Sequence, residues 1–183
     1  MNTLKIKHLL DMKNIQRFSH TPHLQGYNLL EHGFVVGFLF RWIASEEDVP
    51  YDITVWEKVL LHDIVETVTG DLCYLVKNFN NTTADAWDVI EKEIVKSDTT
   101  LAAYTDAALR NSMTERQFRL FKVCDYLDLF LFCHKEIQMG NASKGVMATM
   151  DNCERIIRTI TTDFTIFPIV HKIMQQAVAN IFD

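Results

Sequence analysis

Apolar residues recur at helical spacing along almost the whole chain, and this periodicity limits the possible folds more than any other feature of the sequence. Only 6 glycines and 3 prolines interrupt it in 183 residues, which is too few for the many turns of a β-sandwich or a β-barrel. The length is typical of one globular domain, and no linker, repeat or low-complexity tract divides the chain. The sequence therefore predicts an all-α fold in a single domain over residues 1–183.

Cap residues divide the periodic pattern into separate helices. The cap signals are Asn28 with Glu31 at the third helical position, the capping boxes at residues 54–57 (TVWE) and 114–117 (TERQ), and the stops at Gly70 and Gly140. The expected helices cover residues 3–15, 28–39, 54–67, 72–79, 84–96, 101–110, 114–139, 143–160 and 167–181. Residues 17–27, which include a proline and a glycine, are expected to form a loop.

The composition argues against several classes of protein. A formal net charge of −6 disfavours a protein that coats a nucleic-acid polymer. No apolar run approaches the length of a membrane span, and the N-terminus lacks the apolar block of a signal peptide. The 4 cysteines form no CxxC pair, so free thiols in a reducing compartment are expected. We therefore expect a cytoplasmic protein with no membrane or nucleic-acid partner.

Several ionisable residues occupy positions that the periodicity assigns to the interior. These residues are His32, His62, Asp63, Glu66 and Asp125. A buried carboxylate without a partner is costly, so groups of this kind need a compensating charge or hydrogen bonds. A divalent cation would satisfy the imidazoles and the carboxylates together. A mixed nitrogen and oxygen donor set suits Mn, Fe, Co, Ni or Zn better than Ca, and Mg is also compatible.

Each of these residues also has a structural explanation when it is taken alone. A lone His32 is more often a hydrogen-bonded core histidine than a ligand, and Asp125 can pair with a lysine one turn earlier. Glu66 can serve as a partner that fixes the tautomer of a histidine. Arg17 can be a solvated surface charge, and Phe18 can anchor a loop in the core.

The same residues resemble the motif of the HD-domain phosphohydrolases, in which a histidine, a His-Asp pair and a distant aspartate lie on separate helices. Within that superfamily the chain is similar to the bacterial YfbR-like 5′-deoxynucleotidase branch. The matching blocks are Arg17-Phe18, Glu31-His32, residues 62–72 (HDIVETVTGDL), residues 76–80 (VKNFN), residues 122–125 (KVCD) and Gly140-Asn141. The resemblance covers residues 6–157 and implies an HD-type helical bundle, on which the helix at 167–181 is expected to pack.

The resemblance also implies a role for each site residue. The metal ligands would be His32, His62, Asp63 and Asp125. The catalytic residues would be Asp63 and Glu66, with Glu66 activating the attacking water or moving a proton. The substrate-binding residues would be Arg17 for the phosphate, Phe18 and Asp71 for the deoxyribose, and Lys77 and Lys122 as weaker phosphate contacts.

The function implied is metal-dependent cleavage of deoxyribonucleoside 5′-monophosphates to deoxynucleoside and phosphate. Two alternatives stay open: a deoxynucleoside triphosphate triphosphohydrolase on the same scaffold, and a non-catalytic helical module that binds a nucleotide or a partner. The resemblance further implies a homodimer or higher homo-oligomer. Residues 164–167 and the final helix are candidates for its interface, and core packing explains them equally well.

Overall fold

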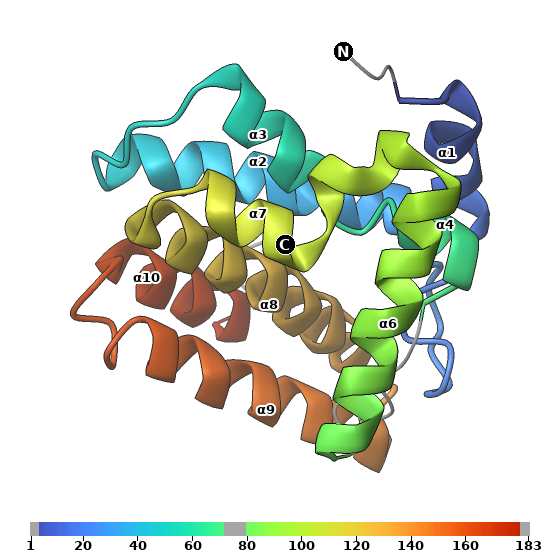
Figure 1. Ribbon diagram of the computed structural model, residues 1–183. Helices are drawn as coiled ribbons and strands as arrows, with labels where there is room; N and C mark the ends of the chain where they lie inside the picture. The colour runs from blue at the N-terminus through green and yellow to red at the C-terminus, as the bar shows by residue number, and fades with distance from the viewer. Residues whose placement is uncertain (1–3, 72–79, 180–183) are drawn as a thin grey trace.

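The structure is a computed structural model, and it describes residues 4–71 and 80–179 of the 183-residue chain. The α-helices are α1 (Ile6–Asp11), α2 (Leu29–Glu46), α3 (Ile53–Leu60), α4 (Glu66–Thr69), α6 (Asn81–Ser97), α7 (Asp106–Ser112), α8 (Glu115–Gln138), α9 (Lys144–Ile160) and α10 (Pro168–Val178) (Figure 1). Two 3₁₀ helices, η1 (Met12–Asn14) and η2 (Thr99–Tyr104), lie between them. Within the described ranges the only β-type pairing is an isolated bridge between Gln16 and Asn28, so the predicted all-α class is confirmed.

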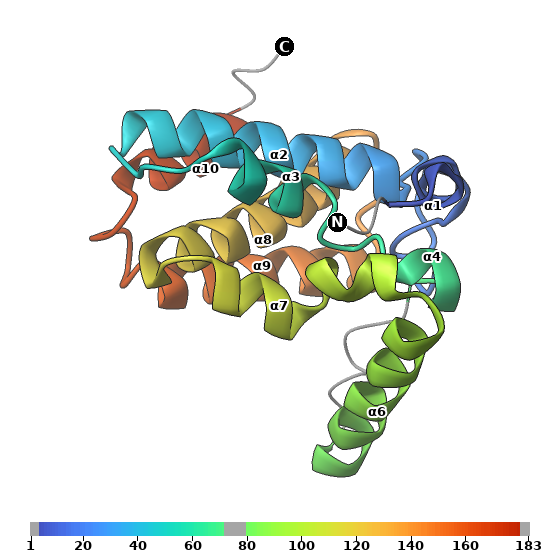
Figure 2. The same ribbon diagram turned by 45° about the horizontal axis from the view of Figure 1, so that its top comes forward.

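The long helix α8 runs through the middle of the molecule. It packs against α9 on one side and α2 on the other, and α10 contacts both α8 and α2 (Figures 1 and 2). On α8, the side chains of Phe121, Leu127 and Phe130 are almost completely buried, as are Phe40 on α2 and Val170 on α10. Burial of one such side chain contributes about 1.5–3 kcal/mol to folding. The core therefore lies where these four helices meet, and α8 is held on several sides.

The predicted cap chemistry explains where two of the central helices begin. The side-chain oxygen of Asn28 accepts a hydrogen bond from the backbone N–H of Glu31 at 3.0 Å, as expected for the start of α2. Thr114 and Gln117 form a reciprocal capping box at the start of α8, also as predicted. Gly70 ends α4 with a φ angle of 76°, a conformation that glycine adopts at little cost.

The helix predicted at residues 54–67 begins earlier than expected. Its N-cap is Asp52, whose side chain accepts a hydrogen bond from the backbone N–H of Val55 at 2.8 Å. The predicted capping box at residues 54–57 is therefore wrong. Aspartate is among the strongest N-cap residues. Asp52 satisfies a backbone N–H of the first helical turn, so the helix begins before Thr54.

The same helix also ends earlier than predicted, at Leu60. The Nδ1 atom of His62 donates to the carbonyl oxygen of Val59 at 2.8 Å, and this is the carbonyl that would accept from the backbone N–H of Asp63 if the helix continued. After that point the backbone bonds span three residues, as in the bond of 2.9 Å from the N–H of Glu66 to the carbonyl of Asp63. The His62-Asp63 pair therefore lies in tight turns between α3 and α4, and not on a helix as predicted.

Other boundaries differ in detail from the prediction. The segment 101–110 is divided into η2 and α7, because the Thr105 side chain accepts from the N–H of Ala108 at 3.2 Å and starts a new helix. The first segment, predicted at residues 3–15, is the short helix α1 followed by η1. The helix predicted at residues 72–79 lies outside the described residues.

Helices α2 and α3 approach each other closely at two glycines. A Cβ atom on Gly33 would lie 2.4 Å from the carbonyl oxygen of Leu60, which is far inside van der Waals contact. Near Gly37 a Cβ atom would meet the Leu60 side chain at 3.1 Å, and the Gly37 carbonyl accepts from the indole N–H of Trp56 at 3.0 Å. Because Gly33 has no side chain, the end of α3 and the turn that follows it can pack closely against α2.

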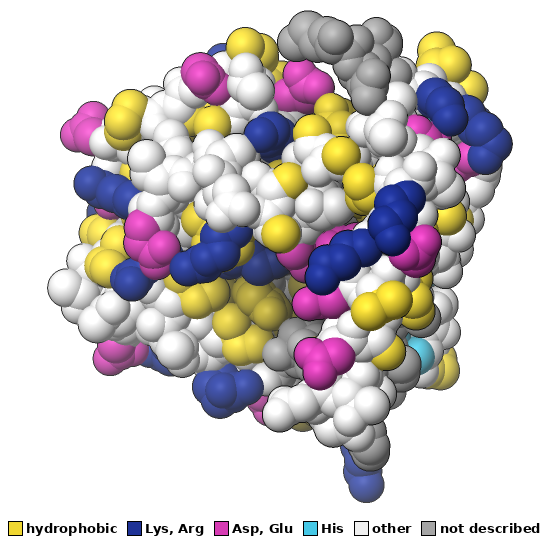
Figure 3. Space-filling model, viewed as in Figure 1, with side chains coloured by type: hydrophobic (Ala, Val, Ile, Leu, Met, Phe, Trp, Pro, Cys, Tyr) yellow, Lys and Arg dark blue, Asp and Glu magenta, His cyan; other side chains and the backbone are white. Residues whose placement is uncertain are grey.

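The structure also bears on the expectations about surface charge, membrane spans, cysteines and residues 164–167. Charged side chains of both signs are interspersed on the face shown in Figure 3. Among the described residues, no helix is long and apolar enough to cross a membrane. Cys124, Cys133 and Cys153 are free and buried, and the fourth cysteine lies outside the described residues. Phe164 and Phe167 are buried in the main core, so core packing explains this aromatic segment.

Candidate metal centre

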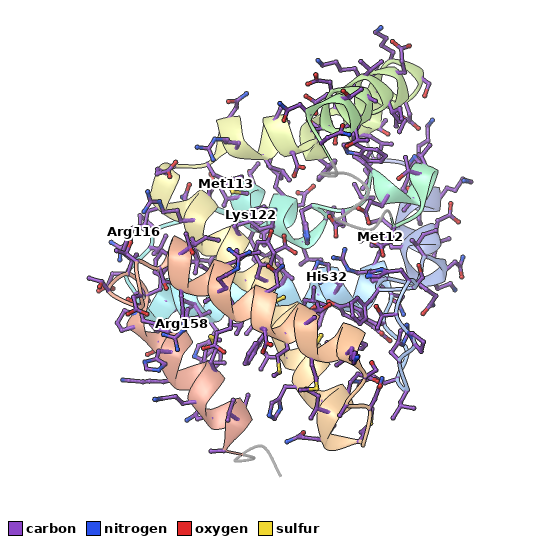
Figure 4. All side chains as sticks on the ribbon, turned by 90° about the horizontal axis from the view of Figure 1, so that it is seen from below. Met12, His32, Met113, Arg116, Lys122 and Arg158 are labelled. Carbon is purple, nitrogen blue, oxygen red and sulfur yellow. The ribbon has the colours of Figure 1, made fainter. Side chains whose placement is uncertain are left out.

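Four predicted site residues converge between α2, the turn after α3 and the middle of α8. The Nε2 atoms of His32 and His62 are 3.1 Å apart. The Oδ2 atom of Asp63 lies 3.5 Å and 3.3 Å from those two nitrogens, and the Oδ1 atom of Asp125 lies 3.3 Å and 3.7 Å from them. Figure 4 shows His32 in the interior, between the helices. The structure thus brings the four side chains together, and their role as ligands stays a prediction.

The hydrogen bonds of the two imidazole rings determine which atoms face the cluster. The Nδ1 atom of His62 donates to the Val59 carbonyl at 2.8 Å, and the Nδ1 atom of His32 donates to Oδ2 of Asp128 at 2.7 Å. In a neutral imidazole the other nitrogen is then an acceptor. The two Nε2 lone pairs therefore point at each other and at the Asp63 carboxylate.

This arrangement of donor atoms fits a bound cation. When both rings are neutral, two nitrogen lone pairs lie 3.3–3.7 Å from two carboxylate oxygens, and positive charge placed between them, from a cation or a proton, makes this arrangement favourable. The ligand atoms of His32, His62 and Asp63 lie within 4.8 Å of one another, so one ion can reach all three. The imidazoles are almost fully buried, whereas Asp63 and Asp125 are 21% and 18% exposed. The cluster is therefore accessible from the side of the carboxylates.

The charges in the cluster shift the pKa values of its members. Burial alone would lower the pKa of His62, but Asp63 and Asp125 raise it to about 10, so without a bound cation the ring holds a proton that a metal ion would displace. Burial alone would raise the pKa of the Asp63 carboxyl, but His62 and Arg17 hold it well below its usual range. The same balance holds for Asp125, where Lys122 is the main group that lowers the pKa. The carboxylates are thus ionised and available as ligands.

Two cationic side chains flank the carboxylates. The Nη1 atom of Arg17 forms a salt bridge with Oδ2 of Asp63 and lies 3.9 Å from Oε2 of Glu66. The Nζ atom of Lys122 lies 3.0 Å from Oδ2 of Asp125, on the oxygen opposite to the one that faces the histidines. Arg17 is largely buried, so it is not a solvated surface charge. Both cations border the exposed side of the cluster, which is the side from which an anionic ligand would approach.

The structure also describes three of the remaining predicted residues, Glu66, Phe18 and Asp71. Glu66 begins α4 and is buried. Phe18 and Asp71 are in direct contact, because the backbone N–H of Phe18 donates to Oδ2 of Asp71 at 3.0 Å. The Phe18 ring is buried and meets Phe132 edge to face, so it anchors the loop at residues 17–27. Lys77 lies outside the described residues.

Sequence reasoning missed two residues that support the centre. Asp128 is buried, and its Oδ2 atom accepts both from His32 and from the hydroxyl of Tyr27, each at 2.7 Å. Asp128 follows Asp125 by three residues, so a search for carboxylates one turn from a proposed ligand would have found it. Tyr27 gave no such signal, because a tyrosine at the end of a loop has many ordinary roles.

The contact between Asp128 and His32 allows a test of the centre. Asp128→Asn should lower the affinity for Zn²⁺ or Co²⁺ by about 10- to 100-fold, because an amide holds the His32 tautomer less firmly than a carboxylate does. The affinity is measured by titration against a competing chelator. Asp85→Asn, an exposed position on α6, is the matched control and should bind like the wild type. Equal affinities in the two variants would contradict the proposed role of Asp128.

A third missed residue, Glu136, holds the loop that carries Arg17. Glu136 is fully buried near the end of α8, and its two oxygens accept from the backbone N–H groups of Leu24 and Gln25 at 2.7 Å and 2.9 Å. The amide of Asn141 donates both to Glu136 at 2.7 Å and to the carbonyl of Pro22 at 3.0 Å. These bonds attach the loop of residues 17–27, which carries Arg17, to the C-terminal end of the central helix.

Comparison with solved structures identifies the fold. The described fold is similar to that of a cyanophage S-2L HD phosphohydrolase, DatZ, solved with dA and one catalytic Zn²⁺ ion bound, with a TM-score of 0.72, 17% identity, and coverage of 98% of this chain and 99% of that one. An HD-domain phosphohydrolase from Listeria innocua matches with a TM-score of 0.72 and 19% identity, over 95% of this chain and 88% of that one. The chain therefore has the fold of these HD-domain phosphohydrolases.

Sequence comparison identifies the family. The pattern of the family described as 5′-deoxynucleotidase YfbR-like matches residues 6–168, so the chain belongs to the YfbR-like family. The 5′-deoxynucleotidase YfbR of Salmonella paratyphi B is 27% identical over 153 residues, which cover 78% of this chain and 77% of that protein. The relative from Salmonella newport gives the same values.

Proposed function

We propose that this protein cleaves deoxyribonucleoside 5′-monophosphates to deoxynucleoside and phosphate with the help of a divalent metal ion. The observation that carries the proposal is the convergence of the His32, His62, Asp63 and Asp125 donor atoms beside the Arg17 guanidinium. Membership of the YfbR-like family and the 5′-deoxynucleotidase relatives support this substrate class. The Zn²⁺ and dA bound to the DatZ structure support a transition metal and a deoxynucleoside moiety.

Each residue in the proposed mechanism has a task that follows from its position. His32, His62, Asp63 and Asp125 would hold the metal ion, and their nitrogen and oxygen donors suit Mn, Fe, Co, Ni or Zn. When bound, such an ion would supply acidified water and polarise a phosphoryl oxygen. We assign the phosphate group to Arg17, whose planar fork matches phosphoryl oxygens.

We assign proton transfer and contact with the sugar to residues near Arg17. Glu66 is buried within 3.9 Å of Arg17 and would accept the proton of the attacking water, which then goes to the O5′ atom as the P–O5′ bond breaks. The products are phosphate and a deoxynucleoside, so the step consumes one water. We assign the deoxyribose end to Asp71 and the backbone around Phe18, which are joined by a hydrogen bond of 3.0 Å next to Arg17 in the chain.

The number of cations favours a monophosphate over a triphosphate. Within the described part of the chain, Arg17 and Lys122 are the cations that contact the cluster, and each already pairs with a ligand carboxylate. A triphosphate would need additional positive charge beyond the α-phosphate. The site therefore supports release of phosphate better than release of triphosphate.

A substrate panel tests the proposed function. The purified protein, loaded with Mn²⁺, Co²⁺ or Zn²⁺ in turn, is incubated with deoxynucleoside mono- and triphosphates and with ribonucleoside monophosphates, and the products are separated by ion exchange. We expect phosphate and deoxynucleoside from the deoxy-monophosphates. Triphosphate released from the deoxynucleoside triphosphates would support the triphosphohydrolase alternative, and no turnover with any metal would support a non-catalytic module.

A conservative variant tests the role of Glu66. Glu66→Gln keeps the size of the side chain but removes the proton acceptor, so turnover should fall by about 10²- to 10⁴-fold while the metal content is unchanged. Both quantities are measured on the same preparation. If the metal content fell together with the turnover, Glu66 would be a support for the ligands and not the base.

A further inference from the structure

A buried histidine connects three segments at one end of the molecule. His8 is the buried residue of α1 and is 5% exposed, whereas Ile6, Leu9 and Leu10 on the same helix are 72%, 37% and 55% exposed. The inward face of this short helix is therefore polar, and buried polar groups need hydrogen-bond partners. Figures 1 and 2 show α1 beside α4 and the C-terminal end of α6, where these partners lie.

Both nitrogens of the His8 ring have a partner on another segment. The Nδ1 atom lies 2.8 Å from the Oγ1 atom of Thr67 on α4, and the Nε2 atom lies 3.1 Å from Oδ2 of Asp98, directly after α6. The Thr67 hydroxyl donates its proton to the carbonyl oxygen of Ile64 at 2.7 Å, so its oxygen accepts from His8. The Thr67 side chain is thus held from two sides.

Asp98 is itself held by several bonds, so it can fix the His8 ring. Its Oδ1 atom accepts from the backbone N–H and the hydroxyl of Thr100 at 3.1 Å and 2.6 Å, and its Oδ2 atom accepts from Nζ of Lys5 at 2.6 Å. The hydrogen bonds from Lys5, Thr100 and His8 hold the pKa of the Asp98 carboxyl below its usual range, so this group is ionised at neutral pH. The His8 ring transmits this constraint to Thr67.

Helix α4 depends on contacts with other segments for its position. It has only four residues, no side chain caps its N-terminus, and Val68 is 52% exposed. A single turn of helix is not stable in water by itself, so tertiary contacts decide where it lies. The bond between His8 and Thr67 is such a contact, because it joins α4 to α1 at the other end of the chain.

We infer that His8 is a positioning residue for Glu66 and that it acts through Thr67. Thr67 directly follows Glu66, so a contact that fixes the Thr67 side chain also limits the movement of the Glu66 backbone. The inference rests on the proposed function, in which Glu66 accepts the proton of the attacking water. Misplacement of a reacting group by about 1 Å can lower a rate by about 100-fold, so a small shift of α4 should be measurable.

Variants of Thr67 test this link without changing a charge. Thr67→Val keeps the shape of the side chain but removes the hydroxyl, and it should lower kcat by about 10- to 100-fold with KM and metal content unchanged. Thr67→Ser keeps the hydroxyl and should keep most of the turnover, whereas His8→Ala should resemble Thr67→Val. Tyr104→Phe is the matched control, because it removes a bond of 2.9 Å to Glu57 that does not involve α4. Circular dichroism checks that all variants are folded.

A double-mutant cycle with Glu66→Gln separates a positioning role from general damage to the site. If His8 and Thr67 act through Glu66, Thr67→Val should lower the remaining turnover no further once the proton acceptor has been removed. An equal loss in both backgrounds would mean that the Thr67 hydroxyl supports the whole site, and it would overturn the inference. A wild-type kcat in Thr67→Val would overturn it as well.

Hydrogen exchange tests the inference independently of turnover. In α4, the backbone N–H of Gly70 is bonded to the carbonyl of Glu66 at 2.7 Å, and that of Val68 to the carbonyl of Val65 at 3.0 Å. Both amides should exchange at least about 10-fold faster in Thr67→Val than in the wild type, Thr67→Ser or Tyr104→Phe, as measured by NMR.

The exchange rates also distinguish a failure of this inference from a failure of the proposed function. Unchanged exchange in Thr67→Val would overturn the role of His8 even in a protein that cleaves deoxyribonucleoside monophosphates. Faster exchange in a protein that cleaves none of the tested substrates would support the placement of Glu66 by His8 and contradict only the proposed reaction.

Discussion

Alanine in place of His62 should remove the bound metal ion and lower turnover by about 10³-fold or more, with the helices intact. His62 supplies one of the nitrogen atoms at the centre of the cluster, and its Nδ1 bond to the Val59 carbonyl fixes the direction of that nitrogen. Stabilisation of charge by a metal ion is worth several kcal/mol, and every 1.36 kcal/mol corresponds to a factor of ten in rate. Loss of the ion should therefore reduce the rate to a small fraction of its original value.

The experiment compares metal content, turnover and helicity in the same samples. His171→Ala is the matched control, because His171 lies on α10, stacked on Phe164, outside the cluster. It should keep both the metal and the activity. Full turnover by metal-loaded His62→Ala would refute the proposed hydrolytic centre, whereas unfolding of the variant would show as a loss of ellipticity. Asp63→Ala, which removes a neighbouring donor on the partly exposed side, should reproduce the loss of activity.

Gly33→Ala should both destabilise the protein and disturb the metal centre. The added methyl group would lie 2.4 Å from the carbonyl oxygen of Leu60, a backbone atom that cannot move without moving the turn that carries His62 and Asp63. Overpacking of this kind costs about 1–3 kcal/mol. For a chain of this size, that is a decrease in Tm of roughly 2–12 °C. Because His32 is next to Gly33, both sides of the cluster are affected.

Thermal unfolding and metal titration measure the two consequences separately. Gly26→Ala is the control, since a Cβ atom at Gly26 would meet no heavy atom within 4 Å. It should change neither the Tm nor the metal affinity by more than experimental error. Gly37→Ala should be intermediate, because its new Cβ atom would meet only the flexible Leu60 side chain, at 3.1 Å. Wild-type stability in Gly33→Ala would mean that α2 and α3 can separate at no cost.

The sequence predicted the convergence of these side chains better than it predicted the elements that carry them. The apolar stripe leading to His62 and Asp63 predicts one helix. The structure has tight turns there instead, because the His62 ring donates a hydrogen bond to the Val59 carbonyl. The convergence of His32, His62, Asp63 and Asp125 was still predictable, since charged groups that follow an apolar stripe face inward in a turn as well as in a helix. The caps at Asn28 and Thr114 were predictable because their bonds are local.

What the sequence did not reveal depends on contacts between distant segments. The bond between Tyr27 and Asp128 joins residues 101 positions apart, and that between Leu24 and Glu136 joins residues 112 apart. No periodicity encodes such pairs. The close approach of Gly33 to Leu60 likewise depends on how two helices pack, and a glycine within a helical pattern gives no information about its neighbour.

Asp125 and Asp128 lie near the middle of the central helix α8. Because this helix also carries much of the core, metal binding and thermal unfolding should be coupled. Any rotation or slippage of that helix large enough to disorder Phe121 or Phe130 would also withdraw both carboxylates from their imidazoles. On heating, release of the metal ion should therefore coincide with unfolding of the core in one cooperative transition. A dye that reports free metal would then trace the same thermal curve as the loss of helical signal.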